Sequence, residues 1–360
     1  MVVILPERKT VDGSRDVTLD WIRGLVILLI VYNHLLAAYG AVPVPGFRIL
    51  ALIFIVPLFF VISGQLFHFE KWHGRFRAFA WRRFERLMLP YFFVNLCFLL
   101  PLYALVGRDF PSPFGSDLPL GRELIGIFYG SLIDGWMNNL NGQLWFLPSL
   151  FVGELMFYVV LSLTSSPCIR WGSVLLLGWF GYCLKDIIML PWSANAALTA
   201  QMFLMAGYTM QQYRWQPGWK STVLAMLLVI LLGHGREADL SVENLGSSVM
   251  VYYLIALAGS MICISLGRAA VRLPYRFQLL LAACGRHSLG VLFWHMMGLV
   301  IAGRLAACLF SRPLITYPFW WFYALAVALL FTFFVIVLGN IVSRRLLDAG
   351  YSGLARLFSW

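Results

Sequence analysis

The sequence predicts an all-α fold: a polytopic membrane helical bundle of about ten transmembrane helices, with both termini in the cytoplasm. Of its 360 residues, 61% are hydrophobic and only 12% are charged, whereas soluble domains carry about 25% charged residues. Apolar stretches recur along nearly the whole chain, and about 20 apolar residues suffice to cross a hydrocarbon layer of roughly 30 Å. Lys and Arg gather in alternate connecting segments, as in membrane proteins of defined orientation.

The apolar segments leave no room for a separate soluble domain, so residues 1–360 are expected to form a single membrane domain. Residues 1–18 are expected to be a cytoplasmic N-terminal segment and not a signal peptide, because the first apolar stretch already has transmembrane length. An even number of spans returns both termini to one side. The expected helices lie near residues 19–39, 48–67, 86–106, 144–164, 171–190, 196–212, 219–234, 247–267, 287–309 and 317–343.

The basic residues orient the chain. A net charge of +11 could suggest a nucleic-acid partner, but membrane proteins acquire such values from Lys and Arg in their cytoplasmic loops. With the N-terminus inside, most basic residues fall in cytoplasmic segments, so we expect membrane lipids and no nucleic acid as surroundings. The densest group lies between the second and third expected helices: Lys71, Arg75, Arg77, Arg82, Arg83 and Arg86.

The longest stretch outside the expected spans is residues 107–143, which is rich in Gly, Pro and Asp. Its apolar portion, from Leu124 to Trp136, is too short to cross a bilayer. We therefore expect an outer, partly interfacial cap over a site.

The sequence lacks the common signatures of soluble enzymes and of metal sites. The Walker pattern, GxSxG, HExxH and a GxGxxG following a strand are absent, which disfavours an ATPase, a serine hydrolase, a zinc protease and a dehydrogenase. No metal is expected, because the cysteines occur singly in apolar surroundings without zinc-ligand spacing. They are Cys97, Cys168, Cys183, Cys263, Cys284 and Cys308.

The first expected helix has the densest set of ionisable residues, and each such residue inside a span is a functional hypothesis. Arg23 and His34 are eleven residues apart, hence about 20° apart on one helical face and about 16 Å apart along it. Asp20 precedes Arg23 by three residues and could neutralise it or serve in catalysis. Beside the polar Asn33, His34 could be a general base, an acyl relay or a structural histidine.

Glu154 lies near the centre of the fourth expected helix, where an unpaired carboxylate would be very costly. It must therefore be protonated, paired or turned toward a wet cavity. If it faces His34, it could fix the imidazole tautomer, as the acid of a catalytic triad does. Otherwise Glu154 is a packing residue.

Two further groups have both a functional and a structural interpretation. His295 and Ser288 lie on the ninth expected helix, where His295 could be an active-site residue or a hydrogen-bonded core histidine. Arg83 and Arg86 stand at the start of the third, where they could bind an anionic ligand. They could equally serve as anchors under the positive-inside rule.

Several of these segments together resemble the membrane acyltransferase family 3, whose members acylate cell-surface glycans in bacteria. LDWIRGLVILLIVYNHL is similar to the family's signature of an arginine and a histidine separated by ten residues, here Arg23 and His34. VPLFFVISGQLF, which contains Ser63, resembles its second helix, and RRFERLMLPY resembles its arginine pair ahead of a proline. NGQLWFLPSLFVGELMFY, which contains Trp145, and CGRHSLGVLFWH follow in the family's order.

The resemblance is greatest to the branch of fucose O-acetylases and exopolysaccharide acetyltransferases. It implies a multi-pass enzyme of the bacterial inner membrane that takes an acyl group, usually acetyl, from cytoplasmic acetyl-CoA. The acceptor would be a sugar hydroxyl of a cell-surface or lipid-linked glycan on the outer side. The implied roles are catalysis for His34, Glu154 and Asp20, acyl-CoA binding for Arg23, Arg83 and Arg86, and support or substrate contact for Asn33, Ser63, Trp145, Ser288 and His295.

Two questions stay open at the level of sequence. His34 could deprotonate the acceptor hydroxyl, or it could become transiently acylated and pass the group on. A transporter of a lipid-linked sugar is the alternative class, since transporters also carry intramembrane charges. The chain shows no paired interrupted helices in corresponding halves, which disfavours that alternative.

Overall fold

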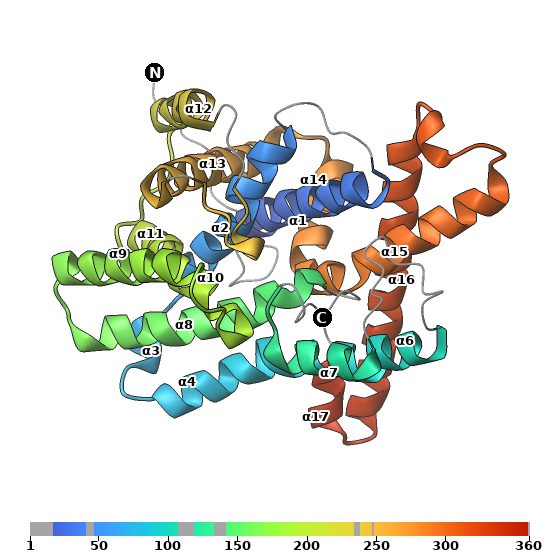
Figure 1. Ribbon diagram of the computed structural model, residues 1–360, viewed down its shortest axis with the longest axis horizontal. Coiled ribbons are helices and arrows are strands. Elements are labelled where there is room, and N and C mark those ends of the chain that lie inside the picture. Colours follow the sequence, from blue (N-terminus) through green and yellow to red (C-terminus); the bar gives the residue numbers. More distant parts are fainter. Residues whose placement is uncertain are drawn as a thin grey trace.

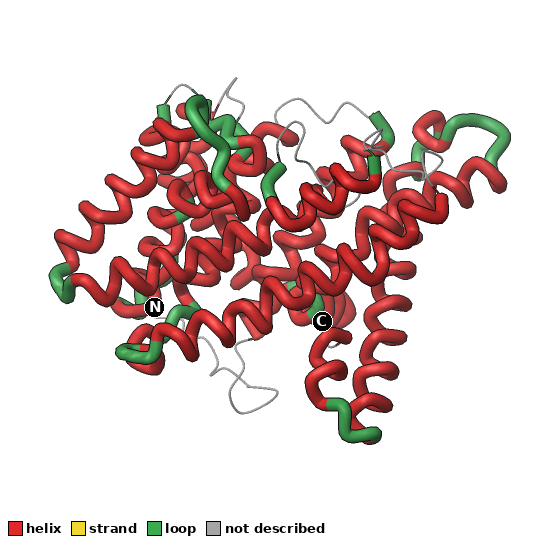
Figure 2. Tube along the Cα trace, turned by 60° about the horizontal axis from the view of Figure 1, so that its bottom comes forward, coloured by secondary structure: helices red, strands yellow, loops and turns green. Residues whose placement is uncertain are grey.

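The computed structural model describes residues 17–40, 47–106, 119–132, 142–233, 238–246 and 248–358. Across these residues the chain is built from helices, and the only strand-like feature there is one isolated bridge between Asp239 and Asn244 (Figure 2). The predicted all-α fold is therefore confirmed. The helices of at least six residues are α1 (Val17–Ala38), α2 (Phe47–Gln65), α4 (Phe76–Arg83), α5 (Leu89–Val94), α6 (Leu100–Val106), α7 (Leu120–Tyr129), α8 (Phe146–Leu163), α9 (Pro167–Leu184), α10 (Ala194–Thr199), α11 (Gln201–Gln212), α12 (Trp219–Gly233), α13 (Val249–Ala269), α14 (Tyr275–Arg286), α15 (Ser288–Leu309) and α16 (Trp320–Asp348).

Several of these helices can cross a membrane, which makes the chain a multi-pass membrane protein. Six segments of the described chain are long and apolar enough: Val17–Ala38, Phe76–Ala104, Gly142–Leu163, Val249–Arg272, Ser288–Leu309 and Trp320–Asp348. Ile53–Gln65 and Trp219–Gly233 are apolar but shorter. All ten expected segments contain helix, while α9, α10 and α11 do not reach the length and hydropathy of a full span.

The third expected span begins about ten residues earlier than predicted. We placed its start at residue 86, but the helical rod starts at Phe76 and runs to Ala104. The sequence Arg75–Arg86 resembles a polar loop, yet long arginine side chains can keep their charge in water while their stems cover apolar surface. Arg82, Arg83 and Arg86 therefore occupy fixed positions on a helix and not on a loop.

Two π-helical turns interrupt this rod, and each has a local cause in the sequence. The turns η1 (Phe84–Met88) and η2 (Asn95–Leu99) come directly before the segments that contain Pro90 and Pro101. A proline inside a helix removes one N–H donor and its ring collides with the carbonyl four residues earlier, so a wider turn accommodates it. The turn η1 presents Glu85 and Arg86 toward the interior cavity.

Glycines let two helix pairs approach closely and so fix the helices that carry the site. A Cβ on Gly24 of α1 would lie 1.9 Å from the backbone oxygen of Leu281 in α14, and one on Gly285 would lie 1.8 Å from that of Asp20. Gly64 of α2 and Gly207 of α11 face each other's helix in the same way. Small residues at such crossings are typical of membrane helices. Figure 1 shows α1 and α14 side by side at the centre of the molecule.

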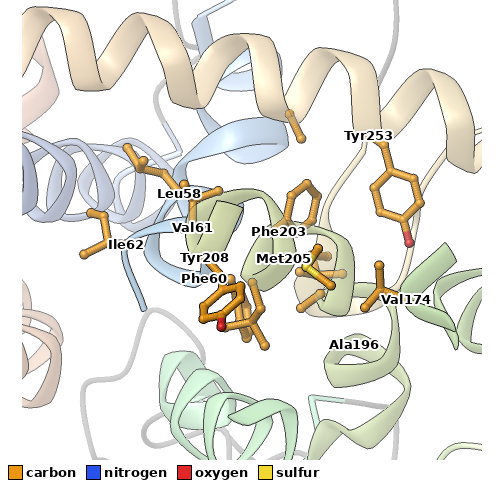
Figure 3. Close-up of a cluster of buried hydrophobic side chains, with 14 of the residues drawn as sticks. Leu58, Phe60, Val61, Ile62, Val174, Ala196, Phe203, Met205, Tyr208 and Tyr253 are labelled. Atoms are coloured by element: carbon orange, nitrogen blue, oxygen red, sulfur yellow. The ribbon is translucent and has the colours of Figure 1, made fainter. Parts of the chain in front are cut away.

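The largest buried apolar cluster packs α2 against α11 and α13. It includes Phe60 and Val61 from α2, Phe203 and Met205 from α11 and Tyr253 from α13 (Figure 3). Lipid tails are as apolar as these side chains, so close packing stabilises the contact more than exclusion of water does. This cluster holds α2 firmly, and α2 forms one wall of the cavity described below.

Part of the expected cap at 107–143 can be checked. The helix α7 has ten residues, too few for a span, and it exposes Leu124, Ile125 and Phe128 while Glu123 is fully buried. This is the pattern of a helix that rests its apolar face against lipid. Residues 107–118 and 133–141 of the expected cap lie outside the described residues, as do residues 1–16 of the N-terminal segment.

Candidate functional site

A cavity of about 960 Å³ runs between α1, α2, η1 and α8. The helix α1 lines it from Arg23 to Ala37, a rise of about 21 Å at 1.5 Å per residue. This length is most of a bilayer's hydrocarbon thickness. The cavity can therefore bring a ligand at one end within reach of a ligand at the other.

The two ends of the cavity differ in charge. One end, which we call the arginine mouth, is lined by Arg82, Arg83, Arg86, Arg286 and Arg356. The opposite end is lined by Gln143, Asp239 and Ser241. Gln143 lies eleven residues, about 16 Å of helical rise, before Glu154, and the other two precede α13, whose far end contacts Ile22 next to Arg23. The arginine mouth suits a polyanion, whereas the other end offers hydrogen-bonding groups to a polar neutral ligand.

His34 lies between the two ends and pairs with His295 of α15. Its Nδ1 is 2.8 Å from Nε2 of His295, and the two rings are nearly parallel, with an interplanar angle of 10° and centroids 5.0 Å apart. His295 is fully buried, whereas His34 is partly exposed to the cavity. The hydroxyl of Tyr39, directly after the end of α1, also donates to the carbonyl of Leu299 in α15.

The contacts of His295 determine which nitrogen of His34 carries the proton. Nδ1 of His295 lies 2.7 Å from the carbonyl oxygen of Val291, and a carbonyl can only accept, so Nδ1 carries the hydrogen. Nε2 of a neutral His295 is then an acceptor, and His34 donates to it from Nδ1. The remaining nitrogen of His34, Nε2, keeps its lone pair. No other hydrogen bond to His34 is recorded within the described chain, so this lone pair is available to a ligand in the cavity.

Glu154 forms a separate polar pair at the level of the arginine mouth. Its carboxylate is 2% exposed, with Oε2 2.8 Å from Nε of Arg83 and Oε1 accepting from the Ser63 hydroxyl. Arg83 also lies over the ring of Phe79. We expected that Glu154 could orient His34, but the residue in that position is His295. The carboxylate instead fixes the guanidinium of Arg83.

Asp20 and Arg23 form the expected contact across one helical turn, at 4.0 Å. Asp20 is buried against α14 and does not line the cavity, whereas Arg23 does. The geometry therefore places Asp20 behind Arg23, where it can orient the guanidinium but cannot touch a ligand in the cavity.

The structure brings most of the other candidate residues to the same cavity. Asn33, Ser63, Trp145, Ser288 and Arg86 all line it. Asn33 is 8% exposed, and its Oδ1 has no hydrogen-bond partner recorded in the described chain. It could therefore accept a hydrogen bond from a bound ligand.

Several polar lining residues were not anticipated as site residues. Arg286 stands within the segment CGRHSLGVLFWH, so its neighbours could have indicated it. Asp239 and Ser241 belong to a connecting segment without any recognisable motif, and Arg356 follows the last span. Only the tertiary structure brings these three to the cavity.

One comparison with known proteins identifies the family. The acyltransferase family 3 model, described as an acyltransferase domain, matches residues 16–339, which is nearly the whole chain. The chain belongs to acyltransferase family 3. Searches of curated proteins and of solved structures give no match. This membrane acyltransferase thus carries its histidine pair, its ion pair and most of its arginine mouth inside the matched region.

Proposed function

We propose that this acyltransferase moves an acyl group, usually acetyl, from acyl-CoA at the arginine mouth to a sugar hydroxyl that enters from the opposite end. The observation that carries the proposal is His34, which presents an unprotonated nitrogen to a cavity that is cationic at one end only. A transporter needs no such base, and the family assignment favours acyl transfer over transport.

The arginine mouth would hold the phosphates of the donor. Guanidinium groups bind phosphate oxygens through paired N–H donors, and these bonds are strongest away from bulk water. Arg83 is held by Glu154, and Arg23 lies about 16 Å along α1 from His34. The long pantetheine arm would follow α1 between these levels and place the thioester beside His34.

The chemistry then balances without a metal. Nε2 of His34 accepts the proton of the acceptor hydroxyl while its oxygen forms a bond to the thioester carbonyl carbon. The carbon–sulfur bond breaks, and the imidazolium returns the proton to the departing CoA thiolate. The same Nε2 would carry the acyl group in a two-step relay. An acyl-enzyme trapped with donor alone would identify the relay.

We further propose ten membrane spans with the arginine mouth and both termini on the cytoplasmic side of the bacterial inner membrane. Support comes from the bias of Lys and Arg toward the segments that would face the cytoplasm. This orientation would give the mouth access to cytoplasmic acyl-CoA. The opposite end would then face a cell-surface or lipid-linked glycan, in line with the resemblance to glycan O-acetyltransferases.

Calorimetric titration of the purified protein with acetyl-CoA tests the donor site. Changing Arg83 and Arg86 to Ala should weaken binding by about tenfold or more, since two phosphate contacts are lost. Arg312→Ala is the matched control, because Arg312 is exposed and does not line the cavity. No acetyl-CoA binding by the unmodified protein would overturn the proposed function.

A further inference from the structure

The chain continues beyond the family match into a short return segment. After α16 it turns through α17 (Ser352–Ala355) and η9 (Arg356–Phe358), and Figure 1 shows α17 at the lower end of α16. We call residues 352–358 the return segment. The family match ends at residue 339, so the family assignment gives this segment no role.

The return segment is packed against the helices around it. The Ser343 hydroxyl of α16 donates to the carbonyl of Ala355 at 2.8 Å, and Ser343 is itself buried. The ring of Phe358 meets that of Phe93 in the third span edge to face, with centroids 5.1 Å apart. These contacts give Arg356, which lies between them in the chain, a defined position.

Arg356 lines the arginine mouth and shares a carboxylate with Arg82. Nη1 of Arg356 is 3.6 Å from Oε1 of Glu85, and Nη1 of Arg82 is 3.6 Å from Oε2. Both contacts exceed the 2.7–2.9 Å of a strong charge-assisted hydrogen bond. Glu85 therefore holds two guanidinium groups at one place.

The arginines of the mouth lie at two depths. The side chain of Arg83 is 17% exposed and its charge is compensated by Glu154. The side chains of Arg82 and Arg356 are 63% and 62% exposed, so they form the outer rim. An acyl-CoA that enters acyl group first keeps the opposite end of the molecule, its adenosine 3′-phosphate, at that rim.

We propose that Arg356, with Arg82, binds the ribose 3′-phosphate of acyl-CoA, so that the return segment is part of the donor site. This inference rests on the proposed function. A phosphate monoester carries a charge between −1.5 and −2 at pH 7 and three acceptor oxygens, which two guanidinium groups held at one place can bind together. Bidentate N–H pairs suit such a group better than a lysine would.

Titrations with CoA and with dephospho-CoA, which lacks only the 3′-phosphate, test the assignment. Arg356→Ala should weaken CoA binding about tenfold and change dephospho-CoA binding less than twofold. The unmodified protein should itself prefer CoA to dephospho-CoA by a similar factor. Arg344→Ala is the matched control, because this exposed arginine lies on the same hairpin without lining the cavity. It should leave both affinities unchanged.

Three results would overturn the inference. The first is that Arg356→Ala binds CoA as tightly as the unmodified protein does. The second is that it loses affinity for CoA and dephospho-CoA equally, which would make the return segment a structural support. An equal effect of Arg344→Ala would show that bulk charge is responsible. Arg356→Lys, which keeps the charge, should retain part of the preference and shows that the segment is still folded. If the unmodified protein binds neither nucleotide, the proposed function itself fails.

Discussion

The histidine pair and the ion pair occupy two levels of one cavity and differ in what their contacts leave available. His34 and His295 are joined by one hydrogen bond, and His295 in turn donates to the Val291 carbonyl. This series of hydrogen bonds leaves one nitrogen of His34 with its lone pair. In the ion pair, one oxygen of Glu154 faces Arg83 and the other accepts from Ser63. The first arrangement is prepared to take a proton, whereas the second holds a charge in place.

The difference follows from the cost of charge in a low-dielectric interior. A histidine pair is neutral until a substrate supplies a proton, so it costs little to keep in the protein interior. Burying an arginine or a carboxylate alone costs much more free energy than burying the two as a pair. Removing one partner therefore leaves an uncompensated buried charge. We therefore assign chemistry to His34 and positioning to Glu154.

Removal of the base should give the largest effect on turnover. His34→Gln is expected to lower acyl transfer by on the order of 10²- to 10⁴-fold, the usual contribution of a general base. Acetyl-CoA affinity should change little, because the phosphates bind at the arginine mouth. The effects on turnover and on affinity are separated by two measurements: transfer of radiolabelled acetyl to the acceptor, and titration of the protein with acetyl-CoA. A His34→Gln protein that folds and transfers acetyl at the normal rate would remove His34 from the mechanism.

The second test removes the acceptor that orients His34. His295→Phe keeps a ring at the buried position but offers nothing to the Nδ1 hydrogen of His34, so either nitrogen can then carry it. We expect kcat to fall on the order of 10- to 100-fold, less than the loss of a charged triad acid causes, with KM for acetyl-CoA unchanged. His295→Gln, which supplies an acceptor oxygen, should recover part of the rate. A change in KM without a change in kcat would contradict the positioning role.

The sequence predicted which residues line the cavity better than it predicted which side chains contact one another there. The eleven-residue spacing places Arg23 and His34 on one face of α1, and both line the cavity. The partner of His34 lies 261 positions away, and no local pattern encodes such a distance. For Glu154 the sequence left open a contact with His34 or a packing role, and the structure instead places Arg83, early on the third span, against it.

The boundaries of the helices show a related limit. The start of the third span was missed because a run of arginines is polar in composition but helical at a membrane surface. The distinction depends on whether apolar surface lies beneath the side chains, as Phe79 does here, packed between Phe67 and Tyr158. That information is contained in the packing and not in the local sequence.

Breaking the ion pair should act on donor binding, so its effect on the rate at saturating acetyl-CoA should be smaller than that of breaking the histidine pair. Glu154→Gln leaves Arg83 without its compensating charge, and we expect turnover at subsaturating acetyl-CoA to fall at least tenfold, about 1.4 kcal/mol. The loss should come from weaker donor binding, so saturating acetyl-CoA should restore most of the rate. If the rate at saturation falls as far as in His34→Gln, Glu154 acts on the chemistry after all. Ser63→Ala, which removes only the hydroxyl donor to Glu154, is the milder companion.

Another buried carboxylate, Glu243, sharpens the comparison, because among the described residues no arginine forms an ion pair with it. Glu243 lies between α12 and α13, outside the membrane-spanning segments, and is 6% exposed; its Oε2 has no hydrogen-bond partner in the described chain. Burial raises its pKa to about 7, although Asn195 and Lys185 oppose the shift. The folded protein therefore keeps this carboxyl protonated at pH values where the unfolded chain has already ionised it.

The sign of the pH effect follows from proton linkage. Between the ordinary pKa of 4.5 and the folded value of about 7, the folded state binds more protons than the unfolded state, so stability falls as pH rises through this window. Glu243→Gln keeps the shape and removes the titration. We expect its apparent Tm in detergent to exceed that of the unmodified protein by a few degrees at pH 8, with the gap closing below pH 4.5. Glu70→Gln, at an exposed carboxylate, should show no such trend. A constant gap at all pH values would contradict the titration assigned to Glu243.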